Sequence, residues 1–158
     1  MLPEEVTQFI GKSTGVRVFE VEKGAIRRFA DAVDDPNPLY WDEEYARNSR
    51  YGSIITPPGF FGWPARQPRG SALTEESMAG LSMALAQVGY SRVLDGGIEY
   101  EFFCPIRAGD TLAASTAIKE IRERKGSTGN MVFLIRETSY INQNGDLAAK
   151  ARSISIHR

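Results

Sequence analysis

Residues 131–156, MVFLIRETSYINQNGDLAAKARSISI, consist of two runs rich in β-branched, aromatic and aliphatic residues on either side of a polar stretch. Such residues are enriched in β-strands. The Asn144-Gly145 pair between the runs is a strong signal for a tight hairpin turn. The sequence therefore predicts two antiparallel strands, over 131–141 and 147–156, joined by that turn.

Two more strand-like runs precede this hairpin, RVLDGGIEYEFF at 92–103 and TLAASTAIKEI at 111–121. Polar segments that contain glycine bound both runs and are typical of turns. Within the second run, Ile121 falls out of the two-residue phase set by Ile118 and the apolar residues before it. One extra residue in a strand corrects such a phase, so we predict a β-bulge near Lys119.

The first half of the chain has helical periodicity. From Lys23 to Val33, apolar residues recur at the spacing of one helix face. These residues are Ile26, Phe29, Ala30 and Val33. A second helix is predicted from Thr74, a good N-cap residue. Its apolar face contains Met78, Leu81, Leu85 and Val88. Together with a short strand at 16–22, this order predicts an α+β fold in which helix covers one face of an antiparallel sheet.

Length and composition limit the classes of function. The chain has 158 residues, which we expect to form a single domain over 1–158. Its apolar fraction of 42% and charged fraction of 25% are those of an ordinary soluble protein, and its net charge is −1. This balance argues against a nucleic-acid-binding surface or a polybasic membrane patch. The longest apolar runs, such as 131–135, are far too short to cross a bilayer.

Cys104 is the single cysteine, which excludes an internal disulfide and favours a reducing compartment, so we expect a cytoplasmic protein. The N-terminal residues lack the layout of a signal peptide. No cysteines and histidines have the spacing of metal ligands, so we expect no metal site. Cys104 is predicted to be a buried, small apolar residue rather than a nucleophile.

Three motifs in a consistent order resemble one family. The run DPNPLY at 35–40 resembles the D-x-N-P-[LI]-H hydratase motif of MaoC-like proteins. GIEYEFFCPIRAGDTL at 97–112 is similar to the strand and P-[VI]-x-x-G-D-x-L signature of the same superfamily. YGSIITPPGF at 51–60 resembles the N-terminal, FAS1-like dehydratase branch, in which Pro-Pro often replaces the His-Gly of catalytic members. The resemblance covers most of residues 10–158.

The resemblance implies a hot-dog fold, in which an antiparallel sheet wraps around a central helix and subunits pair into dimers. It implies acyl-thioester substrates carried on coenzyme A or acyl carrier protein, as in fatty acid metabolism. The reaction that it implies is reversible hydration of a trans-2-enoyl thioester to the (R)-3-hydroxyacyl thioester. Elimination next to a thioester needs acid–base groups and a polarised carbonyl, and no cofactor.

The sequence departs from the catalytic pattern at one position. In catalytic members an aspartate and a histidine five residues later act together; here Asp35 stands at the aspartate position, but Tyr40 stands at the histidine position. An ordinary tyrosine pKa of about 10 would have to fall by roughly 3 units, about 4 kcal/mol, for the phenolate to act as a base at neutral pH. Tyr40 is therefore expected to donate a hydrogen bond or a proton. The only histidine, His157, is expected in an exposed, frayed strand end, where it would make a poor catalytic base.

Each candidate site residue also has a purely structural interpretation. Asp35 is either a general base or water-holder, or an aspartate that bonds to its own turn. Asn37 is a candidate for substrate contact, although we expect it to fix the loop through bonds to the backbone. Tyr40 and the following Trp41 either line an acyl pocket or simply pack.

The stretch after the Pro-Pro pair is the second candidate region. Proline has no N–H, so only Gly59 or Phe60 is left here to donate a backbone hydrogen bond to a thioester carbonyl. Gly59, Phe60 and Trp63 either form the wall of a hydrophobic tunnel or belong to the buried core. Arg66 and Arg69 are candidates for contacts with carrier phosphates, although ordinary surface positions are the favoured interpretation.

Three functions stay open on this basis. The first is a hydratase or dehydratase subunit whose partner hot-dog chain carries the missing histidine. The second is a self-sufficient homodimeric hydratase that uses Asp35 and Tyr40. The third is a non-catalytic module that binds acyl thioesters or stabilises a partner. A hot-dog thioesterase is a weaker enzymatic alternative, because the D-x-N-P loop resembles hydratases.

Overall fold

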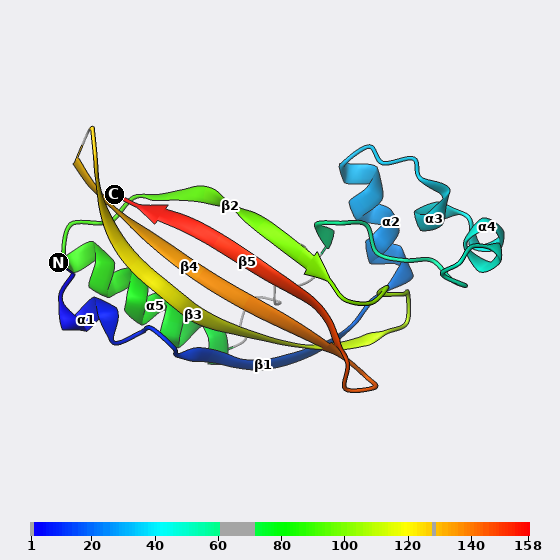
Figure 1. Ribbon diagram of the computed structural model, residues 1–158, viewed down its shortest axis with the longest axis horizontal. Helices are drawn as coiled ribbons and strands as arrows, with labels where there is room; N and C mark the ends of the chain where they lie inside the picture. The colour runs from blue at the N-terminus through cyan, green and yellow to red at the C-terminus, as the bar shows by residue number, and fades with distance from the viewer. Residues whose placement is uncertain (1, 61–71, 128) are drawn as a thin grey trace.

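The computed structural model describes residues 2–60, 72–127 and 129–158. Its main feature is a five-stranded sheet in the order β1-β3-β4-β5-β2, with every neighbouring pair antiparallel (Figure 1). The strands are β1 (Ser13–Glu20), β2 (Val93–Phe102), β3 (Thr111–Gly126), β4 (Gly129–Asn142) and β5 (Leu147–His157). The predicted strands are therefore confirmed, and β1 and β2 form the two edges of the sheet.

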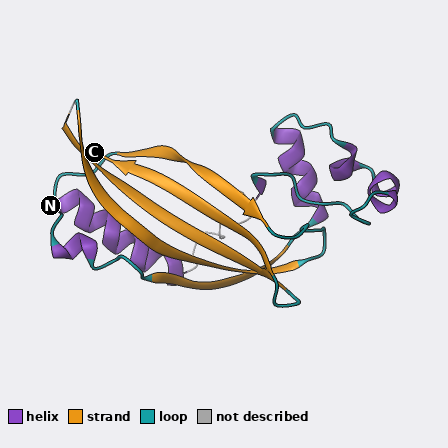
Figure 2. Ribbon diagram, viewed as in Figure 1, coloured by secondary structure: helices purple, strands orange, loops and turns teal. Residues whose placement is uncertain are grey.

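The helices lie in two groups, as Figures 1 and 2 show. One group, α1 (Glu4–Thr7) and α5 (Ala72–Gln87), lies along the sheet near the end where the chain terminates. The other group, α2 (Lys23–Ala32), α3 (Pro38–Trp41) and α4 (Glu43–Asn48), lies beyond the opposite end of the sheet. Leu81 and Leu85 of α5 join a buried cluster with Ile118 and Leu134 of the sheet. A sheet curved over a long helix is the hot-dog arrangement, and the α+β prediction is confirmed.

The predicted bulge and hairpin are both present. The pairing of β3 with β4 changes register between Ile118 and Glu120, so Lys119 is the extra residue. Ile118 and Ile121 are consequently both buried. In the β4–β5 turn, the Asn142 side chain accepts the backbone N–H groups of Asn144 and Asp146. This explains how a short polar segment reverses the chain.

Three details of the predicted helices are wrong. Helix α5 begins at Ala72, so Thr74 lies inside it and is not its N-cap. Val33 follows the last residue of α2 and is exposed, because the backbone there has left helical angles. Val88 likewise lies just past the end of α5 and is exposed. In both cases the predicted apolar face was extended beyond the helix end.

A second buried cluster joins the α2–α4 region to the end of the sheet. It contains Ile26, Tyr40 and Phe60 from that region together with Leu112 and Ala149 from the strands. Burial of each large apolar side chain contributes roughly 1.5–3 kcal/mol. This cluster holds the loop after α2 against the strand ends. Among the described residues, no helix combines the length and apolar character needed to cross a membrane.

Candidate functional site

The loop after α2 begins with a residue in the left-handed conformation. Asp34 has φ +53°, a value that aspartate tolerates better than most residues. The reversal lets the Asp35 N–H donate to the Ala30 carbonyl at 2.9 Å, which satisfies a carbonyl at the end of the helix. Pro36 then biases Asp35 away from helical angles. The DDPNP sequence thus ends the helix and directs the chain across the end of the sheet.

Asp35 and Asn37 both hold this loop in place. Oδ1 of Asp35 accepts the Asn37 N–H at 3.1 Å, and the Asp35 carbonyl accepts the indole N–H of Trp41 at 2.9 Å. Oδ1 of Asn37 accepts the Leu39 N–H at 3.1 Å, which caps α3. The loop-fixing interpretation of Asn37 is therefore confirmed. Asp35 makes the turn bond of its structural interpretation, and its other oxygen, Oδ2, has no hydrogen-bond partner among the described residues.

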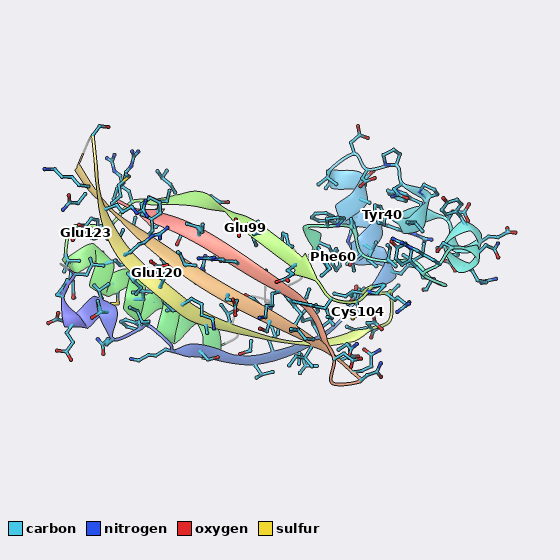
Figure 3. All side chains as sticks on the ribbon, in the orientation of Figure 1. Tyr40, Phe60, Glu99, Cys104, Glu120 and Glu123 are labelled. Atoms are coloured by element: carbon cyan, nitrogen blue, oxygen red, sulfur yellow. The ribbon has the colours of Figure 1, made fainter. Side chains whose placement is uncertain are left out.

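Tyr40 is the buried member of the predicted pair. It lies on α3 (Figure 3). Its side chain is 5% exposed. Burial raises the pKa of its phenol, and Asp35 and Tyr51 raise that pKa further. This is the opposite of the shift that a catalytic base would need. The Tyr40 phenol is therefore protonated at neutral pH, and its role as a hydrogen-bond donor to a substrate stays a prediction.

Tyr40 lines a cavity of about 620 Å³ between the α3–α4 region and the end of β2. The cavity walls come from three segments, the loop 37–40, the stretch 50–58 and the stretch 102–106. Their lining residues are Asn37, Leu39, Tyr40, Arg50, Tyr51, Ile55, Thr56, Pro58, Phe102, Phe103, Cys104, Pro105 and Ile106. An isolated bridge between Ile55 and Arg107 ties two of these segments together.

Asp35 does not line this cavity. Its side chain borders a neighbouring depression together with Asp31, Asp34 and Trp41. The two residues of the predicted pair are thus close enough for Asp35 to affect the pKa of Tyr40, but they border different hollows. Asn37 is the second predicted site residue that lines the larger cavity.

In the region after the Pro-Pro pair, Phe60 belongs to the buried core, whereas Gly59 lies in a turn. Phe60 is fully buried and packs edge-to-face on Phe29, with ring centroids 5.9 Å apart, so it belongs to the core. The Phe60 N–H donates to the Pro57 carbonyl at 3.2 Å. Of the two backbone donors considered, only the Gly59 N–H remains without a hydrogen-bond partner within the described part of the chain. Trp63, Arg66 and Arg69 lie outside the described residues.

His157 is not the exposed terminal residue that we expected. It is 4% exposed, because β5 pairs on both sides, with Val132 of β4 and Val93 of β2 opposite this residue. Its Nε2 lies 3.3 Å from Ser155 Oγ. Burial, and then the charge of Arg136, lower its pKa. It lies at the C-terminal end of the sheet, far from α2–α4 (Figure 1), and therefore does not complete this site.

Cys104 is half-buried and borders the cavity, so the prediction of a buried core residue is only partly right. Burial raises its thiol pKa, and Asp146 and Asp110 add to that effect more than Arg107 opposes it. The thiol is consequently a weak nucleophile at neutral pH. Sequence reasoning missed Arg50, Tyr51, Phe102 and Phe103 as lining residues, because no local pattern brings 50–51 next to 102–104.

Comparisons with known proteins agree with this geometry. The family model described as "FAS1-like, dehydratase domain region" matches residues 8–151, and the chain belongs to this family of MaoC-like hot-dog proteins. A UPF0336 protein of Streptomyces avermitilis is 36% identical over 122 residues, which cover 75% of each chain. A protein of Thermomonospora curvata named "Probable enoyl-CoA hydratase alpha subunit" is 29% identical over 132 residues. That match covers 80% of this chain and 41% of the longer protein.

Solved structures share the fold. A chain of the ChsH1-ChsH2 complex from Mycobacterium tuberculosis superposes with a TM-score of 0.82 at 17% identity, covering 97% of this chain and 93% of the other. A chain of the HadBC (3R-hydroxyacyl-ACP dehydratase) complex from the same organism has a TM-score of 0.71 at 21% identity, with coverages of 94% and 96%. Both are chains of two-component complexes.

Proposed function

We propose that this chain is a subunit of an (R)-specific enoyl-thioester hydratase, or 3-hydroxyacyl-thioester dehydratase, whose partner hot-dog chain supplies the base. The family membership and the named relatives support the reaction class. The observation that carries the need for a partner is the composition of the cavity. Its described lining residues include the donor Tyr40 but no carboxylate and no histidine.

The reaction requires both kinds of group. During hydration a base takes a proton from water, the water oxygen bonds to the β-carbon, and the α-carbon receives a proton. A hydrogen-bond donor that stabilises the negative charge on the thioester oxygen lowers the barrier. Tyr40, with its raised pKa, is suited to donate such a bond. The base is the group that is missing from the described lining residues of this cavity.

One of the two edge strands of the sheet, β2, indicates where a partner chain would pair. Strand β2 is an edge strand with exposed apolar residues that include Val93, Ile98 and Phe102. An apolar edge with unpaired backbone groups is a template for pairing with another strand. Phe102 lies on this edge and also lines the cavity. A chain that pairs with β2 would therefore reach the mouth of the cavity.

The test is hydration of crotonyl-CoA, followed by loss of the enoyl-thioester absorbance. The tagged chain is purified alone and, in parallel, with the proteins that co-purify from its native host. We expect no turnover from the chain alone and turnover from the complex. Replacing the histidine in the partner's D-x-N-P-x-H motif should abolish that turnover, whereas Asp35→Asn should leave it within about threefold.

The self-sufficient homodimer is the second candidate, and the proximity of Asp35 to Tyr40 favours it. Turnover by the chain alone that Asp35→Asn removes would establish this candidate and refute the need for a partner. Acyl-thioester binding without turnover in either preparation would establish a non-catalytic module. Release of free thiol would indicate a thioesterase.

A further inference from the structure

We infer that Arg50 and Tyr51 form an anion subsite at the mouth of the cavity, which binds the phosphate of a phosphopantetheine arm. This arm is common to coenzyme A and acyl carrier protein. The inference rests on the proposed function, because it assumes that a thioester carrier enters this cavity, and it assigns the recognition of that carrier to a particular side chain.

Charge is the first observation. Arg50 is the only charged residue among the described residues that line the cavity. No carboxylate in the described part of the chain forms an ion pair with it. Its one hydrogen-bond partner there is neutral, the Tyr51 hydroxyl at 2.5 Å. A guanidinium carries five N–H donors in a planar fork that suits phosphate oxygens. Arg50 therefore retains donors for an anion.

The second observation is that the Arg50 side chain is held in position. Its guanidinium carbon lies 4.7 Å from the centroid of the Tyr51 ring. The Tyr51 backbone is fixed from two sides, because its carbonyl accepts from Arg107 Nε at 2.8 Å and its N–H donates to Ser49 Oγ at 3.1 Å. Stacking on the ring of a residue whose backbone is held reduces the conformational entropy that Arg50 would lose on binding.

The third observation is the difference in exposure between the charged and the buried lining residues of the cavity. Arg50 is exposed, whereas Tyr40 is buried. The other described lining residues are apolar or neutral, and Phe102 and Phe103 are exposed like Arg50. A phosphopantetheine thioester has a phosphate at one end, then a neutral amide arm and then the reacting acyl group. A phosphate at Arg50 would let the arm direct the acyl group toward Tyr40.

The test compares substrates with and without the phosphate, using the catalytically competent preparation of the full chain. Crotonyl-CoA and crotonyl acyl carrier protein contain the phosphate, whereas crotonyl-pantetheine lacks it. We expect Arg50→Gln to raise the KM for both phosphate-bearing substrates about tenfold, the loss expected for one charge-assisted contact. We expect kcat to change less than twofold, and the KM for crotonyl-pantetheine to stay the same. Arg47→Gln is the matched control, because Arg47 is an exposed arginine on α4 that does not line the cavity.

An equal rise in KM for all three substrates, or no rise for any, would overturn the subsite. A rise for crotonyl-CoA alone would also overturn it, because the contact would then be to the nucleotide part. If no substrate turns over, the proposed function fails, and calorimetry still decides the subsite. Binding of 4′-phosphopantetheine that Arg50→Gln weakens about tenfold, with pantetheine unaffected, supports the subsite. Equal affinities of the wild type for the two compounds refute it.

Discussion

Among single residues, burial decides the protonation state of two titratable groups. One is Tyr40, which the hydratase motif made a site candidate, and the other is His157, which was expected to be a poor base. Tyr40 has its pKa raised by desolvation and by Asp35, and it faces a cavity. His157 has its pKa lowered by desolvation and by Arg136, and it lies among strands at the other end of the sheet. Desolvation favours the neutral form of each group, so the Tyr40 phenol is protonated and the His157 imidazole is a neutral group in the core.

Tyr40→Phe tests the first of these roles. The substitution removes the hydroxyl and keeps the ring, so we expect kcat for crotonyl-CoA hydration by the active preparation to fall roughly 10–100-fold. The melting temperature should change little, because no hydrogen bond of the Tyr40 hydroxyl to a described residue is broken. Tyr45→Phe, on the exposed face of α4, is the control. If Tyr40→Phe left kcat unchanged, the Tyr40 hydroxyl would have no role in the reaction.

His157 gives the folded protein a pH dependence. Since its folded pKa lies below the unfolded value of about 6.5, the unfolded state binds more protons as the pH falls below that value, and stability decreases. At pH 8 both states are neutral, and the contribution is constant. We expect the urea midpoint of the wild type to fall between pH 7.5 and 5.5 more than that of His157→Leu. Parallel curves for the two proteins would show that His157 does not titrate with folding.

At the scale of elements, turns and bulges set which side chains each strand buries. Lys119 shifts the phase of β3, and the turn at Asn142–Asp146 fixes the register of β4 with β5. Both features depend on local chemistry, an extra residue in one case and a glycine at φ +86° in the other.

Two glycine-to-alanine substitutions test whether this local chemistry stabilises the fold. They are expected to change the free energy of unfolding in opposite directions. Gly145→Ala forces a side chain into the left-handed conformation and should lower the free energy of unfolding by roughly 1–2 kcal/mol. Gly24→Ala lies in α2, where helix propensity favours alanine, and its Cβ would meet only the flexible end of Arg28 at 3.3 Å. It should raise the free energy of unfolding by up to about 1 kcal/mol. Equilibrium urea unfolding measures both, and equal effects would contradict the account of the turn.

At the scale of the whole molecule, the two sheet edges differ in what they border. Both β1 and β2 carry exposed apolar residues, for example Val18 and Ile98. Only β2 runs into the wall of the cavity, through Phe102. The proposed assembly therefore uses the β2 edge and leaves the β1 edge free.

Matched lysine substitutions on the two edges distinguish them. Ile98→Lys should disrupt pairing and shift the complex, or the homodimer, to monomer in light scattering after gel filtration, because a charge on an edge strand opposes strand addition. Val18→Lys, on the other edge, should leave the molecular mass unchanged. If Val18→Lys disrupted the assembly and Ile98→Lys did not, the interface would lie at β1 and not at β2.

Local sequence patterns predicted the strands, the bulge at Lys119, the hairpin turn and the α2 helix, and the family motifs are visible in the residues alone. These features are local, since hydrophobic period and turn chemistry act within a few residues. The residue type alone predicted that the Tyr40 phenol is protonated at neutral pH, because an ordinary tyrosine pKa is about 10. Packing of the folded chain places Arg50 and Cys104 at one cavity, places Asp35 at a different hollow and buries His157. Each of these depends on pairing between segments far apart in the chain, such as Ile55 with Arg107 and β2 with β5. No local pattern encodes which distant segments meet, because packing and strand pairing choose them.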